Sequence, residues 1–299
     1  MLPGRFIADE LALLLNTKNG SVTIKKQLLK WIGNKQRCAS EIISFFPLNY
    51  GTYFEPFLGS GAIWGILAPE KAFVSDTFGP LVEIWRMLQS DPEKLKQWYA
   101  ERYERMFQDE KVAGYEGIKA SYNAGPNGAD LLFLCRSCYG GVVRFRQSDG
   151  YMSTPCGIHK PIPPANFASR VDDWKTLTSG AEIACLSYVE AMDQAQDGDL
   201  VYCDPPYSFS QSILYGAQSF SLSNLFAVIN QCKMRGVRVV LSIDGTKQSG
   251  NTICNIPIPE GLFEREVAVN CGRSMLKRFQ MTGQTLDKEI VTDRLLLTY

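Results

Sequence analysis

Short apolar runs alternate along this chain with longer stretches that have helical spacing. The apolar runs predict buried strands at residues 52–54, 71–75, 181–187, 200–203, 237–243, 263–271 and 293–299. The helical stretches lie at residues 8–16, 38–46, 62–68, 81–88, 92–107, 115–123, 129–138 and 222–234. Strands and helices that alternate in this way are typical of an α/β domain.

The alternation stops between residue 80 and about residue 165. Aromatic-rich helical stretches dominate there, followed by an expected hairpin of residues 142–146 and 151–154 around the turn Ser148-Asp149-Gly150. Four prolines at positions 155, 161, 163 and 164 indicate the end of this region. We therefore expect one α/β domain in two parts, residues 1–79 and 166–299, interrupted by an inserted domain of residues 80–165.

The most informative stretch is LVYCDPPY, residues 200–207. A buried strand leads directly into Asp204-Pro205-Pro206-Tyr207, where two prolines with fixed φ make the turn rigid. A carboxylate and an aromatic ring at the carboxyl end of a strand suit a flat ligand that forms hydrogen bonds. We expect Asp204 and Tyr207 to hold a nucleic-acid base.

A second informative stretch is GTYFEPFLGSGA, residues 51–62. Strand, glycine loop and helix form the first unit of a doubly wound sheet, in which Gly59 and Gly61 let the backbone approach a nucleotide-like ligand. The next strand ends on Asp76, where such folds bind ribose hydroxyls. The six-residue fingerprint of dinucleotide-binding proteins is absent, which disfavours a nicotinamide cofactor.

From the composition and the amino-terminal sequence, we expect a cytoplasmic protein. Hydrophobic residues make up 45% of the 299 residues, and no apolar run approaches the ~20 residues of a membrane span. The amino terminus is acidic where a signal peptide would be basic. Nine cysteines without regular spacing fit reduced thiols, and a zinc site at Cys135, Cys138 and Cys156 is disfavoured because the first pair lies in an apolar helical stretch.

Charge and histidine content restrict the chemistry further. The net charge is zero, so a polyanionic partner requires basic residues concentrated on one face. Two clusters qualify, namely Lys25, Lys26, Lys30, Lys35 and Arg37, and then Arg136, Arg144 and Arg146. His159 is the only histidine, which argues against a Ser-His-Asp triad and against a site with several histidine ligands.

Four motifs occur in an informative order: KWIGNK at 30–35, EPFLGSGA at 55–62, Ser75-Asp76, and YCDPPY at 202–207. Together they resemble the Dam-type class of DNA N6-adenine methyltransferases. The stretch FLCRSCYGGVVRFRQSDGYMSTPCGIHKP, residues 133–161, is similar to the recognition hairpin of that class, and the resemblance extends over residues 28–299. It implies a Rossmann-like sheet that uses S-adenosylmethionine, with an inserted, mostly helical DNA-recognition domain carrying a β-hairpin.

The resemblance also implies roles for individual residues. The cofactor pocket would be formed by Trp31, Lys35, Glu55, Pro56, Phe57, Gly59, Gly61, Asp76 and Asp204. The catalytic residues would be Asp204, Pro205, Pro206 and Tyr207, and the DNA-facing residues Lys30, Arg136, Tyr139, Arg144, Arg146, Ser153 and Arg273. The family pattern has asparagine where this chain has Ser153, and glycine where it has Asn34. These departures concern the target sequence more than the reaction.

The expected activity is methyl transfer from S-adenosylmethionine to the N6 amino group of an adenine flipped out of double-stranded DNA, without a metal. A cognate restriction endonuclease is a further partner that the resemblance allows. Two alternatives stay open: methylation of RNA or of a cytosine amino group, and a catalytically silent nucleic-acid-binding protein with the same fold. The intact Asp204, Tyr207 and glycine loop count against the silent protein.

Overall fold

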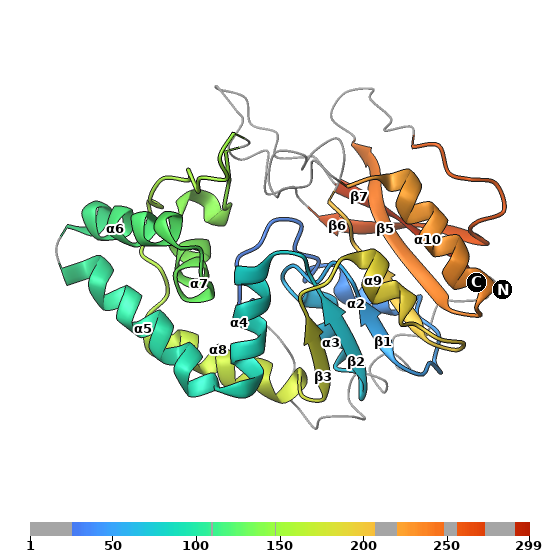
Figure 1. The fold of residues 1–299 in the computed structure, drawn as a ribbon, viewed down its shortest axis with the longest axis horizontal. Coiled ribbons are helices and arrows are strands. Elements are labelled where there is room, and N and C mark those ends of the chain that lie inside the picture. The colour runs from blue at the N-terminus through green and yellow to red at the C-terminus, as the bar shows by residue number, and fades with distance from the viewer. Residues whose placement is uncertain (1–25, 109, 147, 207–219, 248–255, 273–290) are drawn as a thin grey trace.

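The structure is a computed structural model that describes residues 26–108, 110–146, 148–206, 220–247, 256–272 and 291–299. A seven-stranded mixed sheet lies at its centre, with strand order β3-β2-β1-β4-β5-β7-β6 (Figure 1). The strands are β1 (Tyr53–Glu55), β2 (Ala72–Ser75), β3 (Ala181–Ala184), β4 (Leu200–Cys203), β5 (Arg238–Lys247), β6 (Arg265–Gly272) and β7 (Val291–Leu297). The expected α/β architecture is confirmed.

Five strands run parallel, and their order reverses between β1 and β4. β1 pairs with β2 on one side and with β4 on the other, so that Phe54 lies opposite both Phe73 and Val201. β7 runs antiparallel between β5 and β6. In an open sheet of this kind, the crevice at the reversal of strand order is where ligands bind.

Alternate residues of the strands face two separate helical layers. Tyr53 and Val74 belong to a core that is closed by α2 (Ala39–Ile43), α3 (Ala62–Leu67), α4 (Gly79–Ser90) and α8 (Pro164–Leu177). Phe54 and Phe73 belong to a second core, closed by α9 (Tyr188–Asp193) and α10 (Leu222–Met234). Because both faces are covered, the central strands have an unbroken apolar sequence rather than an alternating one.

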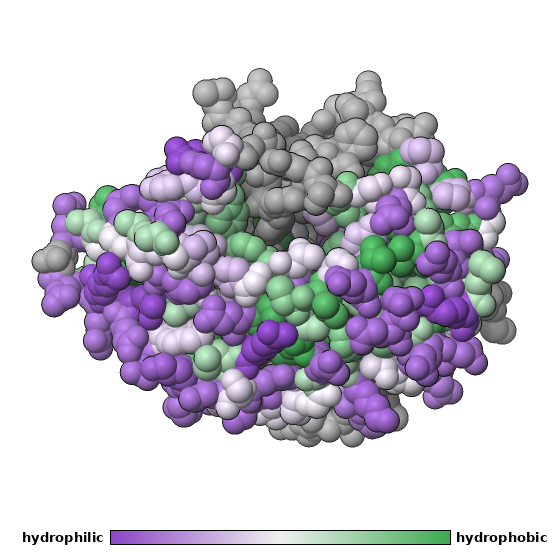
Figure 2. Space-filling model, viewed as in Figure 1, coloured by the Kyte–Doolittle hydropathy of each residue, from purple (hydrophilic) through white to green (hydrophobic). Residues whose placement is uncertain are grey.

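A helical insertion lies between β2 and β3. It contains α4, α5 (Pro92–Gln108), α6 (Lys111–Ala124), α7 (Gly128–Ser137), the short helix η1 (Tyr139–Gly141) and α8. Its outer helices extend away from the sheet in Figure 1, and their surface is largely hydrophilic in Figure 2. Trp85 of α4 contacts both α3 and α8, since its ring lies 5.6 Å from Trp64 and 5.3 Å from Trp174.

The expected hairpin is present in a less regular form. Phe145 and Met152 form an isolated bridge, and Arg146 N donates to Tyr151 O at 2.9 Å. Further along, the Thr154 hydroxyl accepts from Arg144 N at 2.9 Å and donates to Val142 O at 2.9 Å. A side chain thus replaces the backbone ladder there, and regular strands do not form.

Sequence patterns predicted most elements of the described chain but missed α8, α9 and the short helix η1. The prolines that indicated an irregular boundary start α8, with Pro164 at its first position, where a missing N–H costs nothing. α9 carries a capping box between Ser187 and Glu190, a signal that was present in the sequence. The helix expected at residues 8–16 lies outside the described residues.

The first prediction concerns Trp85, which has no exposed surface and donates its indole N–H to Gly59 O at 3.1 Å. Substituting Trp85→Phe keeps an aromatic ring but leaves this carbonyl without its donor. We expect the free energy of unfolding to fall by about 2 kcal/mol, measured by urea denaturation. An unchanged denaturation midpoint would show that the contact adds nothing to stability.

Candidate active site

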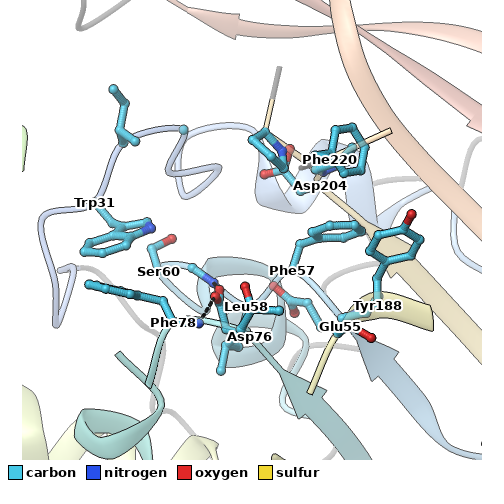
Figure 3. Close-up of a pocket in the computed structure, with 18 of the residues that line it drawn as sticks. Trp31, Glu55, Phe57, Leu58, Ser60, Asp76, Phe78, Tyr188, Asp204 and Phe220 are labelled. Carbon is cyan, nitrogen blue, oxygen red and sulfur yellow. Dashed lines mark hydrogen bonds between the residues drawn. The ribbon is translucent and has the colours of Figure 1, made fainter. Parts of the chain in front are cut away.

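A cavity of about 760 Å³ opens at the reversal of strand order. Three carboxylates line it, each at the carboxyl end of a parallel strand: Glu55 ends β1, Asp76 follows β2, and Asp204 follows β4. Figure 3 shows these side chains around the cavity, with aromatic rings on either side. The fold therefore brings together acidic residues that are up to about 150 positions apart in the sequence.

The glycine loop after β1 forms the floor of the cavity. Gly59 has a φ of +47°, and a Cβ atom there would lie 3.2 Å from the Trp31 ring. Gly61 has a φ of +63° and precedes α3; a Cβ atom there would lie 3.1 Å from the Trp85 ring. Both positions need glycine, since left-handed backbone and close aromatic packing together exclude a side chain.

Asp76 is held in one orientation by the backbone. Its Oδ2 accepts from Gly59 N at 3.1 Å, and its Oδ1 accepts from Phe78 N at 3.0 Å. Burial raises the pKa of Asp76, while these two N–H groups and that of Thr77 oppose the rise. The rings of Trp31 and Phe78 lie 6.1 Å apart beside it (Figure 3).

Glu55 is the most deeply buried carboxylate of the cavity, with 3% of its surface exposed. Its Oε2 accepts from the Tyr53 hydroxyl at 2.7 Å and from Trp64 N at 2.9 Å. Burial raises the pKa of Glu55 to about 8, and the neighbouring Asp204 contributes to the rise. The hydrogen bonds from the Tyr53 hydroxyl and Trp64 N lower the pKa, but by less than burial raises it.

A buried ammonium group lies next to Asp204. Lys35 Nζ is 2.9 Å from Asp204 Oδ1 and 3.2 Å from Asp293 Oδ2. Burial lowers the pKa of Lys35, but the two carboxylates outweigh burial and hold the pKa well above its ordinary value. Sequence reasoning missed Asp293, although an acidic residue at the start of an apolar strand was a signal.

Sequence reasoning expected Phe57 in the cofactor pocket but missed the two aromatic residues that pack against it, Tyr188 and Phe220. Phe57 stacks on Tyr188 with ring centroids 5.2 Å apart, and Phe220 packs against both rings at 5.9 Å. Asn224 Nδ2 donates to the Tyr188 hydroxyl at 2.7 Å. Tyr188 follows β3, so its place beyond the carboxyl end of a strand was the available signal.

The expected cofactor residues are brought together by the fold. Those that line the cavity are Trp31, Lys35, Glu55, Pro56, Phe57, Gly59, Asp76 and Asp204. Gly61 starts the helix behind the loop instead of lining the cavity. Pro205 and Pro206 also line it, whereas Tyr207 lies outside the described residues.

Most of the expected DNA-facing residues are exposed. They are Lys30, Tyr139, Arg144, Arg146 and Ser153. The Arg146 guanidinium forms two hydrogen bonds to Asp149, at 2.7 and 3.1 Å, and lies 4.2 Å from the centre of the Tyr151 ring. Arg273 lies outside the described residues.

Arg136 does not occupy the expected surface position. Only 5% of it is exposed, and its Nη1 donates to Gln27 O at 3.1 Å and to Leu28 O at 2.8 Å. α7 is buried along its whole length, so a cation on it must find partners inside the protein. Arg136 therefore fixes the segment that leads to Trp31 and Lys35 from inside the protein.

Comparison with known proteins assigns the chain to a family. The family model of the D12 class N6 adenine-specific DNA methyltransferases matches residues 31–265. The chain belongs to this class. Its reaction is methyl transfer to the N6 amino group of adenine in DNA, and S-adenosylmethionine is the methyl donor.

Individual relatives cover most of the chain at low identity. The chain is 27% identical to the type II methyltransferase M1.LlaDCHI of Lactococcus lactis subsp. cremoris, over 71% of this chain and 79% of that protein. It is 26% identical to the retron Ec67 DNA adenine methylase of Escherichia coli, over 83% and 87%. It is also 26% identical to the modification methylase StsI of Streptococcus sanguinis, over 86% of this chain but 41% of that protein.

The cavity of this D12 methyltransferase fits S-adenosylmethionine. The positive sulfonium of the donor would suit the cluster of carboxylates, and its ribose would suit a carboxylate in a fixed orientation. Its adenine ring would suit the aromatic walls. When bound, the donor supplies the methyl group. Asp76 suits the ribose hydroxyls because its orientation is already fixed, and the glycine floor leaves room for the donor.

Among the described residues, no helix is long and apolar enough to cross a membrane. No group of three or more His, Cys, Asp or Glu side chains is placed there to hold a metal ion.

The second prediction concerns the pKa of Glu55. Because the folded pKa of about 8 exceeds the unfolded value of about 4.5, the native state retains a proton between these pH values that the unfolded chain has lost. The contribution of Glu55 to the free energy of unfolding is therefore fully present below about pH 4.5 and is lost as the pH rises to about 8. In that window we expect Glu55→Gln to gain about 1 kcal/mol per pH unit relative to the wild type, measured by denaturation from pH 5 to 9. A constant difference between the two proteins would contradict the raised pKa.

Proposed function

We propose that this methyltransferase acts on an adenine flipped out of double-stranded DNA at a specific sequence, with Asp204 and Pro205 holding the amino group. The observation that carries the proposal is the position of Asp204. It follows β4 at the reversal of strand order, it borders the cavity that suits the methyl donor, and 18% of its side chain is exposed.

The chemistry follows from the weakness of the nucleophile. The adenine amino nitrogen shares its lone pair with the ring and attacks poorly. If the Asp204 carboxylate and the Pro205 carbonyl each accept one amino hydrogen, the nitrogen becomes more tetrahedral and its lone pair is freed for attack. Catalysis then consists of positioning and electrostatics, without a covalent enzyme intermediate. Tyr207 is proposed to stack on the flipped base.

We propose the inserted region of residues 80–165 as the DNA-recognition domain. Its support is the group of exposed basic and polar residues around the hairpin, Tyr139, Arg144, Arg146 and Ser153. Lys30, which lies outside this region in the sequence, adds an exposed cation beside Gly141. Asp149 and the Tyr151 ring hold the Arg146 guanidinium in place. A guanidinium held in this way loses little conformational entropy when it binds phosphate or a base edge.

A cognate restriction endonuclease remains a proposal. It is supported by the names of two relatives, one a type II methyltransferase and the other a modification methylase. The retron methylase carries no such indication in its name. We place the reaction in the cytoplasm, as expected from the sequence.

The third prediction tests the acceptor role of Asp204. Asp204→Ala should reduce methyl transfer by about 1000-fold or more, because the amino group loses its charged acceptor. The fold should survive, since Asp293 still compensates Lys35. The measurement is transfer of label from radioactive S-adenosylmethionine to duplex DNA, followed by nucleoside analysis. Turnover of Asp204→Ala close to that of the wild type would overturn the acceptor role. Label from the wild-type reaction in a nucleoside other than N6-methyl-2′-deoxyadenosine would overturn the target assignment.

The fourth prediction tests the hairpin. Arg144→Ala and Arg146→Ala should each weaken DNA binding, measured by titration at several salt concentrations. Loss of a phosphate contact should lower affinity for every sequence and reduce the salt dependence by about one ion, whereas loss of a base contact should relax specificity. Lys71→Ala, which removes an exposed cation directly before β2, outside the inserted region and at the end of the strand opposite the cavity, is the control and should leave binding unchanged. Equal affinity and specificity in all three variants would reject the hairpin as the DNA contact.

A further inference from the structure

Asp293 lies beside the proposed acceptor, although it is 89 residues further along the chain than Asp204. It belongs to β7, opposite Asp244 of β5 and Val269 of β6, and 4% of it is exposed. Through Lys35 it is joined to Asp204, at 3.2 and 2.9 Å. One buried ammonium is thus shared by a carboxylate that follows β4 and a carboxylate of β7.

The charges of this group decide what it does for the reaction. Lys35 and Asp204 alone would form a neutral pair, in which the ammonium would occupy the acceptor. Asp293 adds a second carboxylate, so the three side chains carry one negative charge in excess. Glu55, with its pKa of about 8, is largely neutral at neutral pH and adds little charge.

The excess negative charge can stabilise the transition state of methyl transfer. As the sulfur–carbon bond breaks and the nitrogen–carbon bond forms, the positive charge moves from sulfur to the adenine nitrogen, which then loses one proton to solvent. A negative group near that nitrogen stabilises the moving charge in the transition state. A neutral ion pair would do so far less, and its carboxylate would be a weaker acceptor.

We propose that Asp293 is a positioning residue for methyl transfer: by sharing the Lys35 ammonium, it leaves Asp204 with the negative charge and the acceptor capacity that the adenine amino group requires. The inference rests on the proposed acceptor role of Asp204. Asp293 acts through Lys35 and does not contact the adenine itself.

The test begins with Asp293→Asn, which keeps the shape and removes the charge. We expect kcat to fall on the order of 10-fold, with the KM values for S-adenosylmethionine and DNA within about 2-fold of the wild type. Asp199→Asn is the matched control. Asp199 is also a buried carboxylate, but it precedes β4 at the opposite end of the strand and does not line the cavity, so its variant should keep the wild-type kcat. A wild-type kcat for Asp293→Asn, or an equal loss in both variants, would overturn the proposal.

A double-mutant comparison separates positioning from general stability. In a Lys35→Gln background no ammonium remains to be shared, so adding Asp293→Asn should leave kcat unchanged or raise it. The same fold-loss in both backgrounds would show that Asp293 acts independently of Lys35 and would overturn the proposal. If Asp293→Asn does not fold, Asp293→Glu restores the charge and should retain kcat within about 3-fold; a loss of 10-fold or more in a folded Asp293→Glu would count equally against it.

The activity of Asp204→Ala distinguishes failure of this inference from failure of the proposed function. If Asp204→Ala is active, the acceptor role fails whatever Asp293 does. If Asp204→Ala is inactive and Asp293→Asn has the wild-type kcat, only the present inference fails.

Discussion

Parallel strands that end at one edge of the sheet impose the main constraint on this protein, because they gather carboxylates in one buried place. β1, β2 and β4 each end at, or are followed directly by, an acidic residue, and all three side chains line the same cavity. Burial of several like charges is unfavourable unless each is neutralised or hydrogen-bonded. Much of the surrounding structure serves to satisfy these three groups.

Each carboxylate is satisfied by a different means. Asp76 accepts backbone N–H groups from Gly59 and Phe78, Glu55 accepts the Tyr53 hydroxyl and retains a proton, and Asp204 pairs with Lys35. The differences suit different tasks. A carboxylate fixed by the backbone can hold a ribose, and a protonated one adds little charge. The carboxylate that faces an ammonium shared with Asp293 is the proposed acceptor for the substrate.

The sequence alone predicted those site residues that directly end or follow a strand that is recognisable in the sequence. Glu55, Asp76 and Asp204 each end or follow a recognisable strand, so a parallel sheet brings them to one edge without knowledge of the strand order. Asp293 was not predictable in this way. It lies near the start of its strand, and it reaches the same edge only because β7 runs antiparallel beside β5. Arg136 was misplaced because a basic residue in the sequence does not reveal that its helix is buried.

The hairpin and the cavity share a wall, which gives the two proposed activities a physical connection. Phe145 of the hairpin lines the cavity and packs edge-on against Phe78 at 5.5 Å, and Phe78 N in turn orients Asp76. On the other side, Arg136 anchors the segment that carries Trp31 and Lys35. Phe78 therefore contacts the hairpin through its ring and Asp76 through its backbone N–H. In this arrangement, one residue separates the hairpin proposed to contact DNA from the carboxylate proposed to hold the ribose.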